Sequence, residues 1–194
     1  MANPPPSSAT AIIDPRYCAP ASHPVDLIIT KERTRRDNFT VTDINGNIVL
    51  TVKSSLVTFV TPRQHLFLLD AYGNPIVHLR RALLAANDSW KAFRGESEEP
   101  KDLIFIRKRS SSMFHLRTKL NVFLANNTTE VCDFKVKANL SGTSWDVYKG
   151  ESDTTVVAQI NKKLGTIFSR EKFMVTVCPN IDYAFIVALI VTFD

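Results

Sequence analysis

The amino-acid sequence predicts a mainly β protein, in which a closed antiparallel barrel surrounds its own apolar C-terminal helix. Two observations lead to this fold class. Short apolar runs with a period of two residues follow one another along most of the chain, and the last apolar stretch, Tyr183–Val191, has no polar face. The chain has 194 residues, of which 44% are hydrophobic, so it fits one domain with a sizeable core.

The first 24 residues differ in composition from the rest. Residues 1–24 are rich in Pro, Ala and Ser, and proline cannot donate to a strand ladder. We therefore expect a flexible leader over residues 1–24 and one barrel domain over residues 25–194.

From Val25 onward, apolar and polar side chains alternate as a sheet with one buried face requires. The alternation is visible at Phe39 and Val41, at Ile48, Leu50 and Val52, and at Phe173, Val175 and Val177. About ten to twelve strands follow from these runs, too many for a flat open sheet in a chain of this size.

Two stretches predict tight hairpins. Asp43-Ile-Asn-Gly-Asn and Asp70-Ala-Tyr-Gly-Asn each place Gly-Asn between two apolar runs. Gly46 and Gly73 can adopt the positive φ that such turns require. A looser relative of these turns lies at Val147-Tyr-Lys-Gly-Glu-Ser.

The C-terminal segment is apolar on all sides, so it must be surrounded by protein or by lipid. Its apolar part spans about eleven residues, or about 16 Å as a helix, which is too short for a hydrocarbon core of about 30 Å. We therefore expect a helix inside the barrel, with Asn180 or Asp182 as its N-cap. One more buried strand is the alternative, because Ile, Val and Phe also suit sheets.

The three cysteines, Cys18, Cys132 and Cys178, are far apart and form no CxxC pair. The first residues contain neither a basic nor an apolar signal-peptide region. Together these features predict an intracellular protein. We expect it to be cytoplasmic, with a peripheral fraction at the plasma membrane or in the nucleus.

No pattern in the sequence predicts catalysis or a cofactor. GxSxG, GxGxxG and Walker A motifs are absent, and the four histidines form no metal-binding spacing. We expect neither an enzyme nor a metal site, although His65 and His78 flank one predicted hairpin and could approach each other across strands.

The formal net charge of +5 is compatible with an anionic partner. Three basic pairs two residues apart would each present two cations to one side of a strand. The candidate headgroup-binding residues are Arg107, Arg109, Arg117, Lys119, Lys135 and Lys137. If their strands are neighbours, they form a basic patch suited to phosphoinositides, while outward-facing polar residues of an ordinary barrel are the alternative. Serines beside Arg109 could weaken such a patch when phosphorylated.

Direct nucleic-acid binding is not expected, because no helix-turn-helix, zinc finger or RNA-binding aromatic signature is present.

Several segments, in order along the chain, resemble the plant LURP-one-related proteins. They are Asp14-Pro-Arg-Tyr-Cys, Pro24-Val-Asp-Leu, the two Asp…Gly-Asn turns, Trp90-Lys-Ala-Phe-Arg-Gly, Asp102-Leu-Ile-Phe, Lys149-Gly-Glu-Ser and Pro179-Asn-Ile-Asp-Tyr-Ala-Phe-Ile. The resemblance implies a tubby C-terminal-like fold of twelve antiparallel strands around a hydrophobic helix, shared with tubby proteins and phospholipid scramblases. It also implies a role in plant defence and, through the tubby relatives, phosphoinositide binding and membrane-tethered transcription regulation. It supplies no catalytic residues.

Taken together, these points favour a non-catalytic tubby-like binding or tethering module that contacts anionic phospholipid in plant defence signalling. A protein-interaction scaffold without lipid contact is the alternative. Scramblase-like activity would need a membrane-spanning segment or an acylated cysteine cluster, and the sequence contains neither.

Deleting residues 183–194 tests the predicted position of the C-terminal segment. Because a central core element would be lost, the truncated chain should aggregate or lack a cooperative thermal transition, measured by circular dichroism. A truncated chain that unfolds cooperatively as a soluble protein would contradict the buried helix.

Overall fold

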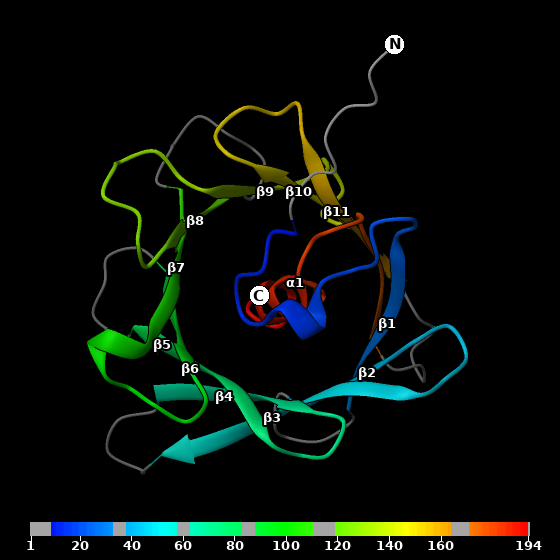
Figure 1. Ribbon diagram of the computed structural model, residues 1–194, viewed down its shortest axis with the longest axis horizontal. Coiled ribbons are helices and arrows are strands. Elements are labelled where there is room, and N and C mark those ends of the chain that lie inside the picture. Colours follow the sequence, from blue (N-terminus) through cyan, green and yellow to red (C-terminus); the bar gives the residue numbers. More distant parts are fainter. Residues whose placement is uncertain are drawn as a thin grey trace.

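The computed structural model describes residues 9–32, 38–57, 63–82, 88–110, 119–163 and 171–193. Within them, twelve strands form one closed antiparallel barrel around a short helix (Figure 1). The strands are β1 (Val25–Lys31), β2 (Phe39–Thr42), β3 (Ile48–Val57), β4 (Arg63–Asp70), β5 (Pro75–Ala82), β6 (Ser89–Arg94), β7 (Leu103–Arg109), β8 (Lys119–Leu124), β9 (Phe134–Ala138), β10 (Ser144–Lys149), β11 (Val156–Lys163) and β12 (Lys172–Val177). The helices are the 3₁₀ turns η1 (Pro15–Tyr17) and η2 (Pro100–Asp102) and the α-helix α1 (Tyr183–Ile190).

Each strand pairs with its neighbours in sequence, and β1 closes the barrel against β12. The closing register places Val25 opposite Val177 and Ile29 opposite Phe173. Closure removes the exposed sheet edges that would otherwise pair with other chains. The predicted fold class is therefore confirmed, as is the inference that so many short strands cannot stay flat.

The two Gly-Asn turns join β2 to β3 and β4 to β5, and they share one geometry. In the first, the Asp43 Oδ1 atom accepts hydrogen bonds from the backbone N–H groups of Asn45 and Asn47, both at 2.9 Å. Asp70 does the same in the second turn. Gly46 and Gly73 have φ values of 86° and 89°, so the prediction of positive φ at both glycines is confirmed.

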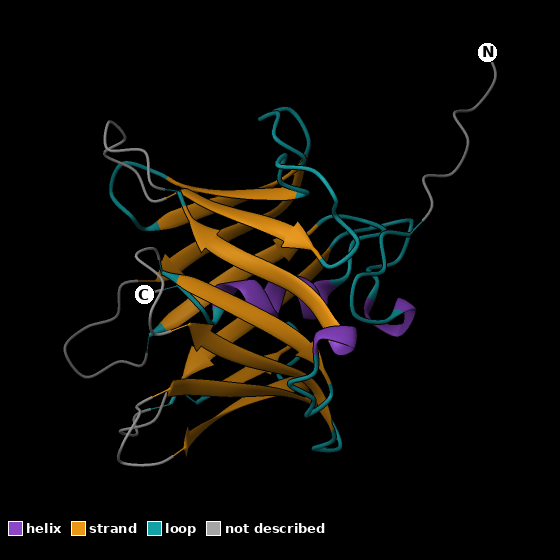
Figure 2. Ribbon diagram, turned by 90° about the vertical axis from the view of Figure 1, so that its left-hand side faces the viewer, coloured by secondary structure: helices purple, strands orange, loops and turns teal. Residues whose placement is uncertain are grey.

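Helix α1 lies along the barrel interior (Figures 1 and 2). All of its residues except Tyr183 are buried, so the helix prediction is confirmed and the alternative of a further strand is wrong. The centre of the Phe185 ring lies 5.3 Å from that of Phe105 on β7 and 4.9 Å from that of Phe134 on β9, so the helix packs against this part of the wall. In the described part of the chain, no helix has the length and hydropathy needed to cross a membrane.

Residues 9–24 lie across one end of the barrel, in front of α1 in Figure 1. The backbone N–H of Thr10 donates to Asn180 at 2.7 Å, and that of Ala19 donates to Ile181 at 2.8 Å. Tyr17 is buried and its ring meets Tyr183 at 5.7 Å. The described part of the expected leader is thus hydrogen bonded to the barrel, while the division of the chain at residue 24 stays a prediction.

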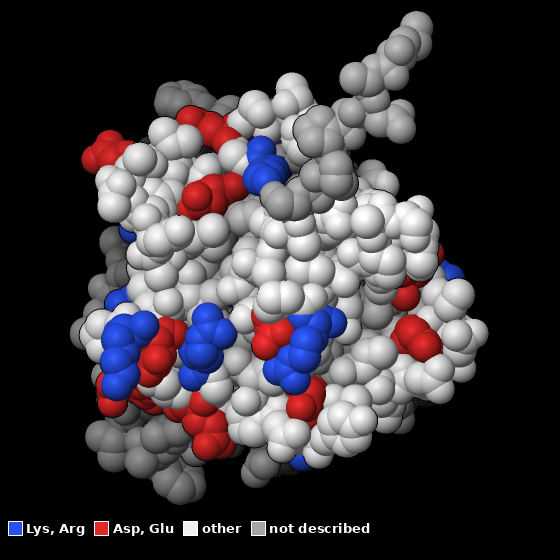
Figure 3. Space-filling model, in the orientation of Figure 1, with Lys and Arg blue, Asp and Glu red and all other residues white. Residues whose placement is uncertain are grey.

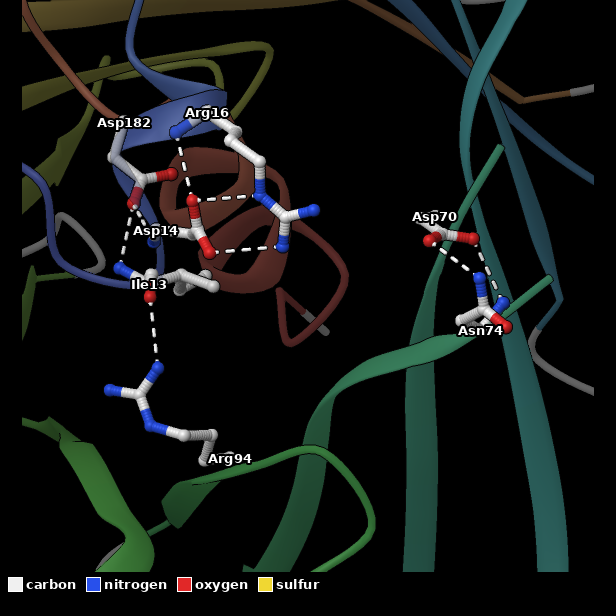
Figure 4. Close-up of polar contacts among 7 residues, drawn as sticks. All are labelled: Ile13, Asp14, Arg16, Asp70, Asn74, Arg94 and Asp182. Carbon is white, nitrogen blue, oxygen red and sulfur yellow. Dashed lines mark hydrogen bonds and ion pairs between the residues drawn. The ribbon is translucent and has the colours of Figure 1, made fainter. Parts of the chain in front are cut away.

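The carboxylate of Asp182 joins this leader to the helix (Figure 4). Its Oδ1 atom accepts from the N–H of Phe185 at 3.0 Å and so caps α1. Its Oδ2 atom accepts from the N–H groups of Ile12, Ile13 and Asp14 at 3.1, 2.7 and 3.2 Å. Of the two N-cap residues expected, the structure uses Asp182, which is completely buried.

Replacing Asp182 with alanine should lower the free energy of unfolding by at least about 2 kcal/mol, because one helix cap and three leader hydrogen bonds are lost. Urea denaturation measures this change. Asp26→Ala is the matched control, since Asp26 is exposed and, among the described residues, its carboxylate accepts a side-chain hydrogen bond only from the Thr176 hydroxyl. It should change the free energy by no more than about 0.5 kcal/mol. Equal effects of the two variants would contradict the role given to Asp182.

Candidate functional site

A cavity of about 350 Å³ lies at the end of the barrel where α1 finishes. The leader lies at the opposite end (Figure 2). The cavity is the strongest candidate site because cations and aromatic rings meet in it. The lining residues are Lys31, Arg107, Arg109, Leu120, Ala138, Gly142, Trp145, Lys162, Glu171, Phe173 and Phe193.

Aromatic side chains form one wall of the cavity. The Trp145 ring lies 6.1 Å from Phe173 and 5.5 Å from Phe193. Phe193 is held there because its N–H donates to Ile190 at 2.9 Å in the last turn of the chain. Such a wall can contact the apolar part of a ligand.

Positive charge dominates the polar part of the cavity, where four Lys or Arg side chains face a single carboxylate. That carboxylate, on Glu171, pairs with the Lys162 ammonium. The same ammonium lies 5.9 Å from the centre of the Phe173 ring. The excess of cations makes this end of the barrel suited to an anionic ligand.

Arg107 is buried, and it donates hydrogen bonds to polar groups at the C-terminal end of the helix. Its Nε atom donates to the Thr192 hydroxyl at 3.2 Å, and its Nη2 atom donates to the Thr192 carbonyl. A cation at this position also complements the negative end of the helix dipole. Burial lowers the pKa of Arg107, opposed by its bond to Asp88.

Asp88 holds Arg107 in place by accepting from its Nη1 atom, and it also accepts from Arg81 Nε at 3.0 Å. Burial opposes ionisation of this carboxyl. The hydrogen bond and charge of Arg107, together with the charges of Arg81 and Arg109, outweigh burial and lower the pKa of Asp88 below its ordinary value.

The six basic residues predicted from sequence do not share one surface. Strands β7, β8 and β9 are neighbours, as the patch required. However, Arg107 pairs with Val122 and Arg109 with Leu120, both buried, so this pair faces the barrel interior and its mouth. The barrel wall therefore separates it from the other pairs.

Lys119, Lys135 and Lys137 lie on the outer face. Lys119 is directly opposite Lys137, and Phe134 and Val136 on either side of Lys135 point inward. Lys135 is buried and donates to the Glu151 carbonyl, while Lys137 pairs with Asp153. Arg117 lies outside the described residues. The outer cations Lys135 and Lys137 are thus partly neutralised.

Sequence reasoning missed Lys31 and Lys162, and also the aromatic wall. The two lysines stand at or next to the ends of β1 and β11, strands far from β7 in sequence. Their position at strand ends could have marked them as candidates for a site at the barrel end, but only barrel closure brings these strand ends together.

The leader end offers a second, smaller cavity of about 250 Å³ that includes Arg16 and Arg94. Both guanidinium groups are engaged, Arg16 with Asp14 at 3.0 Å and Arg94 with the Ile13 carbonyl at 3.0 Å (Figure 4). On this face, Lys and Arg lie beside Asp and Glu instead of forming one positive field (Figure 3). This end is therefore the weaker candidate for an anionic ligand.

Comparison with known proteins gives a consistent family. A family model described as LURP-one-related matches residues 25–194. LURP-one-related 15 of Arabidopsis thaliana is 43% identical, with 98% of this chain and 88% of that protein covered. LURP-one-related 10 from the same plant is 43% identical, with 95% of each covered, and LURP1 is 40% identical, with 93% and 86% covered.

The fold also matches a solved structure. An X-ray structure of a protein from Arabidopsis thaliana superposes with a TM-score of 0.70 at 39% sequence identity. The match covers 93% of this chain and 94% of that one.

The lowered pKa of Asp88 makes a pH prediction. Because the pKa is lower in the folded than in the unfolded chain, ionised Asp88 stabilises the fold, and this contribution is lost as the pH falls below about 4. The difference in unfolding free energy between the wild type and Asp88→Asn should therefore be largest near neutral pH and shrink in acid. Urea titrations between neutral and acidic pH measure it. A difference that stays constant over this range would contradict the assignment.

Proposed function

The chain belongs to the LURP-one-related family, and we propose that it is a non-catalytic binding module that recognises anionic phospholipid, phosphoinositides included, in plant defence signalling. The observation that carries the proposal is the cavity at the end of α1, where Arg109, Lys31 and Lys162 stand beside an aromatic wall.

The two halves of the cavity match the two halves of a phospholipid. Guanidinium and ammonium groups form charge-assisted hydrogen bonds to phosphate, and cations near an anionic membrane surface each contribute about 1 kcal/mol. Trp145 and Phe173 can contact the glycerol and the first acyl carbons, as aromatic side chains do at membrane interfaces. Barrel closure supports these groups on rigid strands.

Absence of catalysis is part of the proposal and has its own support. Among the described residues that line the cavity there is no Ser, Cys, His or Asp, and the one carboxylate of this set, Glu171, pairs with Lys162. This set supplies no nucleophile with an adjacent base and no pair of carboxylates for acid–base chemistry.

The link to defence rests on the family resemblance and on the relatives named LURP1 and LURP-one-related. We further propose that the protein acts inside the cell as a peripheral tether at the cytoplasmic face of a membrane. The cavity opens at one end of the barrel, so docking there would leave the leader end turned away from the lipid.

A protein-interaction scaffold is the second candidate function, and exposed apolar side chains favour it. Tyr72 is 92% exposed and Ile44 is 71% exposed, at the tips of the two Gly-Asn turns. Val131, in the connection from β8 to β9, is also exposed at the same end of the barrel. These loops are suited to contact a partner protein.

Vesicle co-sedimentation tests lipid recognition. Wild-type protein at low salt should bind phosphatidylcholine vesicles that contain a phosphoinositide and should not bind pure phosphatidylcholine. Replacing Lys31 and Arg109 together with glutamate should weaken binding at least about tenfold, because two favourable charges become unfavourable.

Two further variants complete the design. Lys172→Glu is the matched control, since Lys172 is exposed on the outer face of β12, next to the inward-facing Phe173. Lys119→Glu with Lys137→Glu tests the outer face. Loss of binding in this last variant alone would assign the site to the outer wall. No phosphoinositide-dependent binding by the wild type would exclude the lipid function, and a partner pull-down that survives all these changes would favour the scaffold.

A further inference from the structure

A small second core lies on the outside of the barrel, over β4, β5 and β6. The connection from β6 to β7, which carries η2, folds back over the outer wall here (Figures 1 and 2). Beneath it, His78 stacks on Phe67 with ring centres 4.5 Å apart, and Phe93 lies 6.3 Å away. His65 and His78 are 4% and 1% exposed. Two histidines are therefore buried outside the main core, and they approach each other across strands, as their flanking positions on one hairpin suggested.

Hydrogen bonding fixes the protonation of one ring. His78 Nδ1 lies 3.1 Å from the Ser97 carbonyl oxygen, which can only accept, so Nδ1 carries the proton. The Nε2 atom of neutral His78 then offers a lone pair. It points at His65 Nδ1, which is 2.7 Å away. A ring nitrogen oriented through a backbone carbonyl in this way is the usual arrangement of a metal-binding histidine.

Glu98 brings a carboxylate to the same place. Its Oε1 atom lies 3.7 Å from His65 Nδ1, and its Oε2 atom accepts from Arg80 at 2.7 Å. The carboxylate thus has one oxygen held by Arg80 and the other turned to the histidines.

We propose that His65 Nδ1, His78 Nε2 and Glu98 Oε1 form a binding site for a divalent transition-metal ion of the Zn²⁺ type. Their ligand atoms all lie within 4.8 Å of one another. Zinc bonds of about 2.0–2.1 Å in a tetrahedron require ligand atoms about 3.3 Å apart. The separations of 2.7 and 3.7 Å lie on either side of this value, and His78 Nε2 and Glu98 Oε1 lie within 4.8 Å of each other. Movement of the half-exposed Glu98 side chain toward the two histidines completes the geometry.

The exposure of the Glu98 side chain determines how a metal ion can enter the site and what can complete its coordination. The Glu98 side chain is 46% exposed, so an ion can enter from solvent on its side, and water can fill the fourth position. Nitrogen and carboxylate ligands together suit Zn²⁺ and its neighbours better than Mg²⁺ or Ca²⁺. This proposal departs from the expectation, drawn from sequence spacing, that the chain has no metal site.

Metal binding here would join three segments of the chain. His65 is on β4, His78 on β5 and Glu98 on the connection from β6 to β7. A bound ion would therefore fasten this connection to the barrel wall and stabilise the folded state in proportion to ion concentration. None of the three residues lines the cavity at the end of α1, so the metal site does not rest on the proposed lipid function.

Calorimetric titration with Zn²⁺ after treatment with a chelator tests the site. The wild type should bind one ion per chain, and saturating Zn²⁺ should raise its melting temperature. Glu98→Gln should weaken binding at least about tenfold. Because Glu98 is half exposed, this variant should fold, whereas a change at buried His78 could unfold the chain.

Two controls separate this site from adventitious binding. Glu99→Gln removes a neighbouring exposed carboxylate that pairs with Lys101, and His23→Gln removes an exposed histidine beside Ser22. Both should bind Zn²⁺ as the wild type does. Co²⁺ in place of Zn²⁺ should give ligand-field bands without a thiolate charge-transfer band, which excludes the three cysteines. Absence of binding, binding unaffected by Glu98→Gln, or a thiolate band would overturn the proposal.

Discussion

The structure depends on one constraint: an apolar helix lies inside a barrel, so the polar groups at both of its ends must find partners in the protein. At the first end, the Asp182 carboxylate accepts from the N–H of Phe185. At the other end, the Arg107 guanidinium donates to the carbonyl and hydroxyl of Thr192, which is 1% exposed. Unpaired groups at these depths would each cost about 1–3 kcal/mol. A helix without a polar face is therefore stable only because a carboxylate and a guanidinium have been buried with it.

These two buried charges make the ends of the barrel different. Asp182 has hydrogen-bonding capacity beyond one helix cap, and it uses this capacity to hold Ile12, Ile13 and Asp14, which lie about 170 residues away in sequence. That end is consequently covered by the leader. At the opposite end, Arg107 needs a counterion, which Asp88 supplies while it also accepts from Arg81. At that end the helix is capped by side chains of the barrel wall instead of by the leader, so a cavity remains there.

Sequence alone could predict the barrel and its helix, but not the site. In β9, Phe-Lys-Val-Lys-Ala alternates strictly, so Lys135 and Lys137 can be read as outward-facing. In β7, Leu-Ile-Phe-Ile precedes Arg107 and is apolar on both faces, so the sequence does not reveal which face points inward. Phe105 and Arg107 share one face because they are two residues apart, and only the structure shows that this face points inward. The attachment of the leader to the barrel could not be predicted for another reason. The leader is held through its backbone amides, which are the same for every residue type except proline and so leave no trace in composition.

The same arrangement determines what kind of recognition the cavity can provide. The charge of Arg107 is largely balanced by Asp88 and by the helix end, so it contributes little to the field at the mouth. Lys162 is likewise balanced by Glu171. Lys31 and Arg109 also line the cavity, and they stand at the ends of β1 and β7. Long side chains at strand ends can adjust to a phosphate bound in any of several positions, whereas donors fixed inside a pocket cannot. A site of this kind distinguishes anionic from neutral lipid by charge, and it distinguishes poorly among headgroups that carry the same charge in different positions.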